Sequence, residues 1–287
     1  MLGVPPLAGS YFLGSVQKVS SPNAHERVHQ AADVRSFNQM DNFYQALARG
    51  EVKASGVMNY IQHLYIALRC PENASVLDMC CGRGLQLPLL ARYSPSLGSY
   101  VGIDLAEAAL AEAELTLRDL RKNYRLSFPV SFYRCDVSDP SLARLGKFDV
   151  VVYTSALEHM PRDKGAESLR NAATCLADSG RLYLSTPRTP RDAIRRLQYS
   201  VHVYEWDRAE LEAVLTSAGL DIVDCFGLLP PDTDIAVVNS LRRRYGDGAV
   251  SWYRAMEARV PCQFIATTVA VAFPDIAREL MFVCRKP

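Results

Sequence analysis

The feature that most limits how this chain can fold is an apolar run that ends in an acid and leads into a turn with two glycines. The run is Val76–Asp78, and the turn contains Gly82 and Gly84. A helical pattern follows, and a second apolar run, Tyr100–Asp104, again ends in an acid. Glycine lacks a Cβ, so the backbone can turn sharply there and approach a ligand closely. This order predicts a strand, a turn, a helix and a second strand, the unit that binds a nucleoside-bearing cofactor at the carboxyl ends of a parallel sheet.

Further elements are predicted downstream of this unit. Strand-forming residues occupy Val130–Asp136, Phe148–Tyr153 and Arg181–Pro187. The helical spacing of Leu169–Leu176 is expected to stop at Gly180, because glycine is common just after a helix.

The last part of the core has its own signals. Asp207 is expected to be the N-cap of a helix, with Glu210 completing a capping box and Gly219 at the helix end. Two final strands are predicted over Leu220–Phe226 and Glu279–Cys284.

The glycine turn distinguishes two cofactors. A dinucleotide fingerprint has a third glycine for close packing of the helix on the strand, and Leu87 occupies that position here. The acid followed by two glycines, at Asp78, Gly82 and Gly84, instead resembles the first motif of class I S-adenosylmethionine-dependent methyltransferases. The usual first glycine of that family is replaced by Cys80.

The resemblance covers residues 75–225, about half of the chain, in the order and spacing of the strands and in their terminal acids. It implies an α/β fold: a Rossmann-like, doubly wound, seven-stranded, mostly parallel sheet with an antiparallel final hairpin. We expect residues 1–70 to form an N-terminal arm and helical cap, and residues 71–287 to form the methyltransferase core. A helical insertion at about 227–278 is long for a hairpin connection. We expect it to fold with the N-terminal helices over the carboxyl edge of the sheet, as a lid around the methyl acceptor.

The resemblance also implies S-adenosyl-L-methionine as the cofactor. Asp78 is expected to meet its ammonium group, Asp104 its ribose hydroxyls and Asp136 its adenine amino group. Asp78 could instead be an N-cap-like acid that holds the turn, and Asp136 an ordinary turn residue. The complete set expected at the cofactor is Asp78, Cys80, Gly82, Gly84, Asp104, Leu105, Asp136, Val137 and Thr154.

The candidate catalytic pair is Glu158 and His159, which follow the fourth predicted strand. An imidazole titrates near neutrality, so His159 could take a proton from a hydroxyl or amine acceptor. The alternative is a helix start in which both side chains only satisfy backbone groups. His202, Tyr204, Trp206 and Tyr60 are expected to bind the acceptor, although Tyr204 or Trp206 could face the core. His63 is expected to be a packing residue.

Composition limits the partners. The net charge is +1, so no overall field attracts nucleic acid or an anionic membrane. No apolar stretch is long enough to span a membrane, and the eight cysteines form no C-x-x-C pair, which argues against a zinc site and for a reducing, cytoplasmic location. No bound metal is expected, and the oligomeric state is not indicated.

The expected function is methyl transfer to a small molecule, aromatic or phosphorylated, in specialised (natural-product) metabolism; that setting rests only on an alanine- and arginine-rich composition. The sequence Thr154–Leu157 lacks the Asn/Asp-Pro-Pro-aromatic loop of DNA and protein-glutamine methyltransferases. Three alternatives stay open. One is a dinucleotide-dependent oxidoreductase, and another is a catalytically silent scaffold that binds the cofactor. The third is an RNA cap guanine methyltransferase, a family that the chain also resembles. The phosphates of the RNA would then meet Arg188, Arg191, Arg195, Arg196 and Arg242–Arg244.

Overall fold

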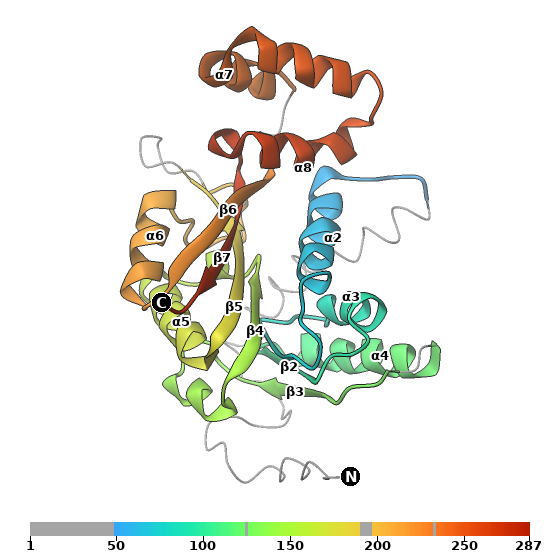
Figure 1. The fold of residues 1–287 in the computed structure, drawn as a ribbon, viewed down its shortest axis with the longest axis vertical. Coiled ribbons are helices and arrows are strands. Elements are labelled where there is room, and N and C mark those ends of the chain that lie inside the picture. The colour runs from blue at the N-terminus through green and yellow to red at the C-terminus, as the bar shows by residue number, and fades with distance from the viewer. Residues whose placement is uncertain (1–48, 124–125, 190–196, 232–233) are drawn as a thin grey trace.

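The computed structural model describes residues 49–123, 126–189, 197–231 and 234–287 (Figure 1). Within these residues, seven strands form one sheet in the order β3-β2-β1-β4-β5-β7-β6. The strands are β1 (Ser75–Met79), β2 (Ser99–Asp104), β3 (Val130–Arg134), β4 (Phe148–Thr154), β5 (Leu176–Pro187), β6 (Asp221–Leu229) and β7 (Glu279–Arg285). The expected N-terminal arm, and the part of the helical cap up to residue 48, lie outside the described residues.

The pairing confirms the expected sheet. Strands β1 to β5 pair in parallel, whereas β7 runs antiparallel to both β5 and β6. The parallel strands are nearly continuous apolar runs because helices cover both faces of the sheet. In β1, for example, Leu77 and Met79 belong to the apolar core on one face, and Val76 to the core on the other.

The helices lie in two layers. One layer contains α2 (Ala54–Ala67), α3 (Gln86–Tyr93) and α4 (Glu107–Asn123), and the other contains α5 (Arg162–Cys175) and α6 (Arg208–Ser217). Short 3₁₀ turns complete the connections: η1 (Pro140–Leu145), η2 (Leu157–His159) and η3 (Pro274–Ile276). Among the described helices, none combines the length and apolar character needed to cross a membrane.

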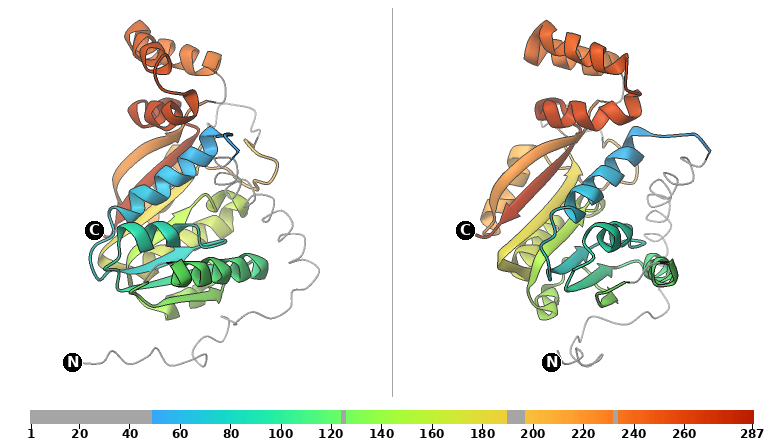
Figure 2. Two further views of the ribbon diagram at one scale, coloured as in Figure 1. Left: turned by 90° about the vertical axis from the view of Figure 1, so that its right-hand side faces the viewer. Right: turned by 45° about the vertical axis from the view of Figure 1, so that its right-hand side comes forward.

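The insertion between the last two strands is helical, as expected. It contains α7 (Asp234–Glu257) and α8 (Cys262–Ala272), which share a small apolar cluster of their own. Figure 2 shows this pair beyond the end of β6, where α8 packs against β6 and α2.

One helix boundary differs from the sequence prediction. Helix α5 ends at Cys175, and Gly180 lies inside β5 instead of ending the helix. A Cβ at Gly180 would lie only 3.0 Å from the backbone oxygens of Phe148 and Asp149, so this glycine permits the close approach of β5 to β4.

At α6, Asp207 is the N-cap and accepts from the Ala209 amide (3.0 Å), and Gly219 has a φ of 78°, as expected at the helix end. Glu210 forms no capping box. It accepts instead from Arg162 Nε (2.5 Å) and from the Tyr204 hydroxyl (2.8 Å), because it faces α5 rather than the start of its own helix.

Candidate cofactor and acceptor site

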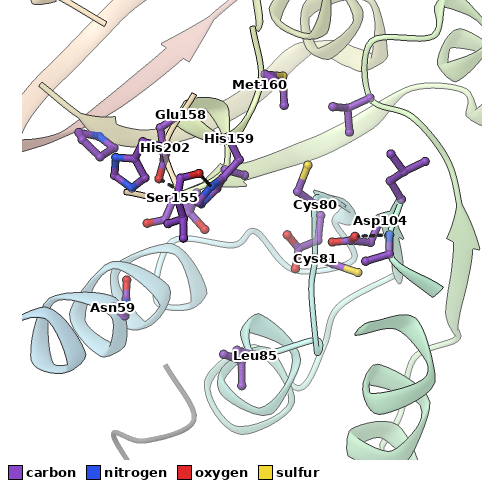
Figure 3. A pocket seen from close by; sticks show the side chains of 18 of the residues that line it. Asn59, Cys80, Cys81, Leu85, Asp104, Ser155, Glu158, His159, Met160 and His202 are labelled. Carbon is purple, nitrogen blue, oxygen red and sulfur yellow. Dashed lines mark hydrogen bonds and ion pairs between the residues drawn. The ribbon is translucent and has the colours of Figure 1, made fainter. Parts of the chain in front are cut away.

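A cavity of about 430 Å³ lies at the carboxyl ends of the parallel strands (Figure 3). Of the residues expected at the cofactor, seven line it: Asp78, Cys80, Asp104, Leu105, Asp136, Val137 and Thr154. Gly82 and Gly84 lie in the adjoining turn and are not among the described lining residues. The acids that end three adjacent strands therefore meet in one place, as expected from their positions in sequence.

The turn after β1 depends on left-handed backbone conformations. Gly82 and Gly84 have φ values of 53° and 72°, and Cys80 has a φ of 57°. This conformation suits glycine, whereas a residue with a Cβ is strained there by about 1 kcal/mol or more. The cysteine therefore retains the backbone shape of a glycine turn, and its thiol points into the pocket (Figure 3).

Asp104, at the end of β2, is fixed by two backbone amides. Its Oδ2 accepts from the Gly82 amide (2.9 Å) and its Oδ1 from the Ala106 amide (2.8 Å). The side chain is buried and lines the cavity. A carboxylate accepts several hydrogen bonds at once, so Asp104 can hold this orientation and also accept from the hydroxyls of a ribose.

Asp78, at the end of β1, is a buried acid suited to a cationic partner. The Tyr100 hydroxyl donates to its Oδ2 (2.6 Å). Burial raises the pKa of Asp78 to about 7, and the Asp104 carboxylate adds to this shift while the Tyr100 hydrogen bond opposes it. An ammonium group placed beside Asp78 would favour its charged form.

Asp136 combines a turn role with its place in the cavity wall. Its Oδ1 accepts from the amide (2.8 Å) and the hydroxyl (2.7 Å) of Ser138. The side chain therefore has the turn role and also lines the cavity, while its contact with the adenine amino group stays a prediction.

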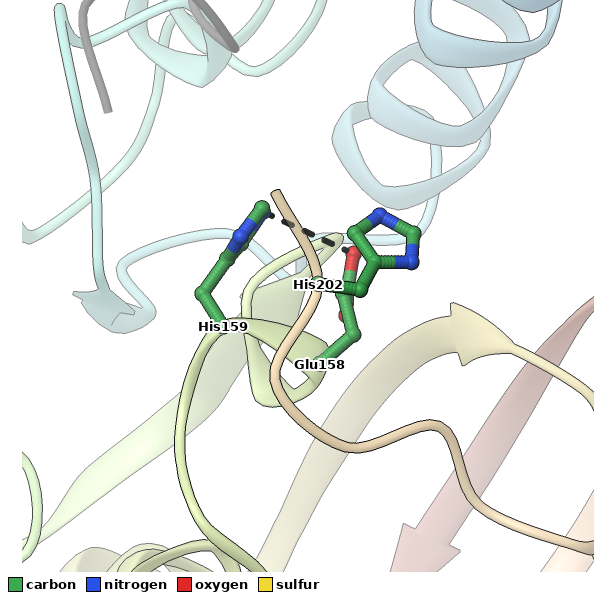
Figure 4. A group of neighbouring side chains, drawn as sticks. All are labelled: Glu158, His159 and His202. Carbon is green, nitrogen blue, oxygen red and sulfur yellow. Dashed lines mark ion pairs between the residues drawn. The ribbon is translucent and has the colours of Figure 1, made fainter. Parts of the chain in front are cut away.

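The other end of the cavity contains the two candidate catalytic residues (Figure 4). His159 Nδ1 lies 3.3 Å from the carbonyl oxygen of Val201. A carbonyl oxygen can only accept, so Nδ1 is the donor in this contact, and in the neutral ring Nε2 then has the lone pair. His159 Nε2 is 4.0 Å from Glu158 Oε1, and the buried Glu158 carboxylate also accepts from the Thr186 hydroxyl (3.0 Å).

His202 lies beside His159 and is held by a second carboxylate. Its Nδ1 is 2.5 Å from Glu205 Oε1, and its ring centroid is 5.3 Å from that of His159. Burial would raise the pKa of Glu205, but hydrogen bonds from His202, Thr189 and the Gln198 amide hold it below its ordinary value.

Glu158, His159 and His202 bring ligand-type atoms within 4.8 Å of one another. Sequence spacing did not indicate this cluster, because His159 and His202 are far apart in the chain. Each imidazole has an acceptor at Nδ1, so we interpret the group as two histidines oriented by neighbouring acceptors. The expectation that no metal is bound stays a prediction.

Three residues expected at the acceptor lie elsewhere. Trp206 is 1% exposed and belongs to the apolar core, and the Tyr204 ring packs against it at 5.1 Å. Tyr60 packs against the core under α2, and neither it nor the other two is among the described residues that line the cavity. Their aromatic rings are used in packing, the alternative that the sequence had left open for Tyr204 and Trp206.

Helix α2 contributes other side chains to the wall. Ser55, Met58, Asn59 and His63 line the cavity from this helix. His63 is buried, as expected of a packing residue, and burial lowers its pKa to about 4, so the ring is neutral at pH 7.

No described residue of α7 or α8 lines the cavity, and of the described residues in the expected insertion only Leu229 does. Of the two parts expected to form the lid together, the N-terminal helices contribute to the cavity wall through α2, and the insertion packs on α2 through α8. The role of either part as a lid stays a prediction. Sequence reasoning missed Ser155 and Glu279 as well, which are separated along the chain and meet only in the fold.

Comparison with known proteins agrees with this geometry. Residues 57–224, more than half of the chain, match the family model described as a methyltransferase domain. A ubiquinone biosynthesis O-methyltransferase of Xanthomonas axonopodis pv. citri (strain 306) is 32% identical over 197 residues, which cover 63% of this chain and 77% of that relative. The chain belongs to the class I S-adenosylmethionine-dependent methyltransferases. S-adenosyl-L-methionine is its cofactor.

Solved structures show the same fold. A TehB-like methyltransferase from Corynebacterium glutamicum ATCC 13032 Kitasato aligns with a TM-score of 0.53 at 14% identity, over 88% of this chain and 99% of that one. The [4+2]-cyclase SpnF aligns with a TM-score of 0.52 at 16% identity, over 80% of both chains. At such identities the likeness concerns the fold alone, and the chemistry must be argued from the site.

Proposed function

We propose that this methyltransferase acts on a hydroxyl oxygen of a small-molecule acceptor. The observation that carries the proposal is the orientation of His159, whose Nδ1 is engaged by a backbone carbonyl while Nε2 is left to accept a proton. The likeness to an O-methyltransferase supports the same acceptor atom.

The proposed mechanism needs few groups. When bound, S-adenosyl-L-methionine supplies a methyl group on a positively charged sulfur. His159 Nε2 takes the proton of the acceptor hydroxyl, which makes the oxygen a better nucleophile. Glu158, 4.0 Å away, stabilises the imidazolium that forms. Apolar side chains such as Met58, Met160 and Leu229 in the wall exclude water and help to align the acceptor.

The lining favours a neutral acceptor over a phosphorylated one. Among the described lining residues, Lys164 is the single lysine or arginine. Two acids, Glu158 and Glu279, lie at the acceptor end of the cavity. A role in specialised metabolism remains part of the proposal and rests on composition alone. We also propose a cytoplasmic location, since all eight cysteines are free, as in a reducing compartment.

The RNA cap alternative has less support. Arg242–Arg244 lie on α7 and are exposed, away from the cavity wall. Arg191, Arg195 and Arg196 lie outside the described residues. A basic surface at α7 would serve equally well as a solvated helix face.

The proposal is tested with methyl-labelled cofactor and a panel of phenols, aliphatic alcohols, amines and capped RNA. We expect transfer to hydroxyl acceptors. His159→Gln should lower kcat about 100-fold and leave the affinity for S-adenosylhomocysteine unchanged. The matched variant His202→Gln should mainly raise KM. Transfer to amines or to RNA alone would contradict the proposal, and tight cofactor binding with no transfer to any acceptor would favour the silent scaffold.

A further inference from the structure

Glu279, the first residue of β7, is a buried acid that the proposed mechanism does not use. It is 6% exposed and lines the cavity. It pairs with Pro187 at the end of β5 and with Leu229 at the end of β6. The cofactor acids end β1 and β2, so Glu279 lies on the acceptor side of the sheet edge.

A polar network directs this carboxyl group. The Ser155 hydroxyl donates to Glu279 Oε1 (3.0 Å). The side-chain amide of Gln62, on α2, donates to Ser155 Oγ (3.2 Å) and accepts from the Ser185 hydroxyl (2.7 Å). The network joins the ends of β4, β5 and β7 to the helix above them, so Glu279 has a defined position.

Ser155 is itself held in an unusual conformation. Its φ is 48°, and its amide donates to the Ser185 carbonyl (2.9 Å). This left-handed conformation costs a residue with a Cβ about 1 kcal/mol or more, which the surrounding hydrogen bonds must offset. One result of the conformation is that the Ser155 hydroxyl reaches Glu279.

The surroundings favour the protonated form of Glu279. Burial raises its pKa to about 8, and the Glu158 carboxylate adds to the shift. The hydrogen bonds from Ser155 and Ser185, and the charge of Arg278, oppose it. Leu229 of β6, which pairs with Glu279, and Gln62 of α2, which reaches it through Ser155, carry no charge. A protonated carboxyl has one O–H to donate and can still accept from Ser155.

We propose that Glu279 is a second acceptor-binding residue, which donates a hydrogen bond to an acceptor oxygen next to the hydroxyl that is methylated. This inference rests on the proposed function and narrows its substrate class. The acceptor carries two nearby oxygens, the reacting hydroxyl and an ether, carbonyl or hydroxyl oxygen that accepts from Glu279. An anionic group does not suit this position, because it would add a negative charge beside Glu158 in a buried site.

Two matched probes test the inference: 2-methoxyphenol, which has the second oxygen, and 2-ethylphenol, which has the same shape without it. For the unmodified protein, we expect kcat/KM to be about five- to tenfold higher for 2-methoxyphenol, the ratio that one hydrogen bond provides. Glu279→Gln keeps a donor of similar size and should keep the preference. Glu279→Leu should abolish it by raising KM for 2-methoxyphenol alone.

Glu210→Gln is the matched control, since Glu210 is a buried acid outside the described cavity lining; it should keep the full preference. Equal kcat/KM for both probes in the unmodified protein would overturn the inference, as would a preference that persists in Glu279→Leu. A loss of kcat in Glu279→Gln would assign proton transfer, not binding, to this residue and also overturn it. If Glu279→Leu does not fold, Glu279→Met, which also removes the donor, takes its place with the same expected and contradicting results. Lack of transfer to both probes by a protein that binds S-adenosylhomocysteine would instead overturn the proposed function, and the inference with it.

Discussion

At the scale of single residues, the most unusual position is Cys80, where the chain uses a cysteine in a glycine conformation. We expect Cys80→Gly to change the free energy of unfolding by less than about 1 kcal/mol, because relief of strain and the greater freedom of the unfolded chain oppose each other. Cys80→Val should destabilise the protein by about 1–2 kcal/mol more than Cys80→Gly, since a β-branched residue tolerates positive φ poorly. Denaturant unfolding measures both. Equal stability of the two variants would mean that the φ of 57° is not the native conformation.

Asp78 gives a prediction about pH. Its pKa is raised to about 7 by burial, and its charged form is the one that an ammonium group favours. Cofactor binding should therefore strengthen about tenfold between about pH 6 and about pH 8, as Asp78 becomes ionised in the free protein. Titration calorimetry with S-adenosylhomocysteine at the two pH values measures this. Asp78→Asn should bind more weakly and show little dependence on pH; an unchanged pH dependence in that variant would assign the effect to another group.

At the scale of the elements, α2 packs on the sheet through apolar side chains, and one buried amide adds hydrogen bonds to the strand ends. Gln62 is fully buried and joins Asn59 on its own helix to Ser155 and Ser185 at the ends of β4 and β5. Gln62→Leu keeps the size of the side chain and removes these hydrogen bonds, so we expect a loss of about 2 kcal/mol of stability.

Hydrogen exchange locates the effect of this change. Amides of α2 should exchange faster in Gln62→Leu, whereas those of α5, on the other face of the sheet, should be unaffected. A uniform increase across both helices would mean that Gln62 supports the whole fold and not the attachment of α2.

The elements differ in how far the sequence could predict them. The central strands β1 and β4 could be predicted because each is a largely apolar run followed by turn residues. Gly180 and Glu210 were misinterpreted because their local patterns, a glycine after a helix and a glutamate after an N-cap, are satisfied equally well by contacts with β4 and α5. Such contacts come from other parts of the chain and leave no local signal.

The difference between local patterns and contacts from distant parts of the chain also applies to the candidate site. The cofactor side could be predicted because its acids follow successive strands at regular spacing. Of the residues expected near the acceptor, Glu158, His159 and His202 line the cavity, whereas Tyr60, Tyr204 and Trp206 are not among its described lining residues. Its remaining polar groups lie on α2, after β4 and on β7, and only the three-dimensional structure brings them together.

At the scale of the whole molecule, the identity of the cofactor can be tested by how much a ligand stabilises the folded protein. A ligand present at 100 times its dissociation constant stabilises the folded state by about 2.7 kcal/mol. S-adenosylhomocysteine should raise the melting temperature accordingly, whereas NAD should not, because Leu87 occupies the place of the third glycine. Stabilisation by NAD alone would contradict the assignment of the cofactor.

The anchoring of Asp104 has a further consequence for turnover. Its carboxylate is held in one orientation by the Gly82 and Ala106 amides. In the proposed contact with the cofactor ribose, Asp104 therefore needs no rearrangement. S-adenosylhomocysteine, the product, has the same ribose and would make the same contact. An interaction that is equally strong before and after the reaction does not accelerate it. We therefore expect release of S-adenosylhomocysteine to limit the turnover rate, and its accumulation to inhibit the enzyme.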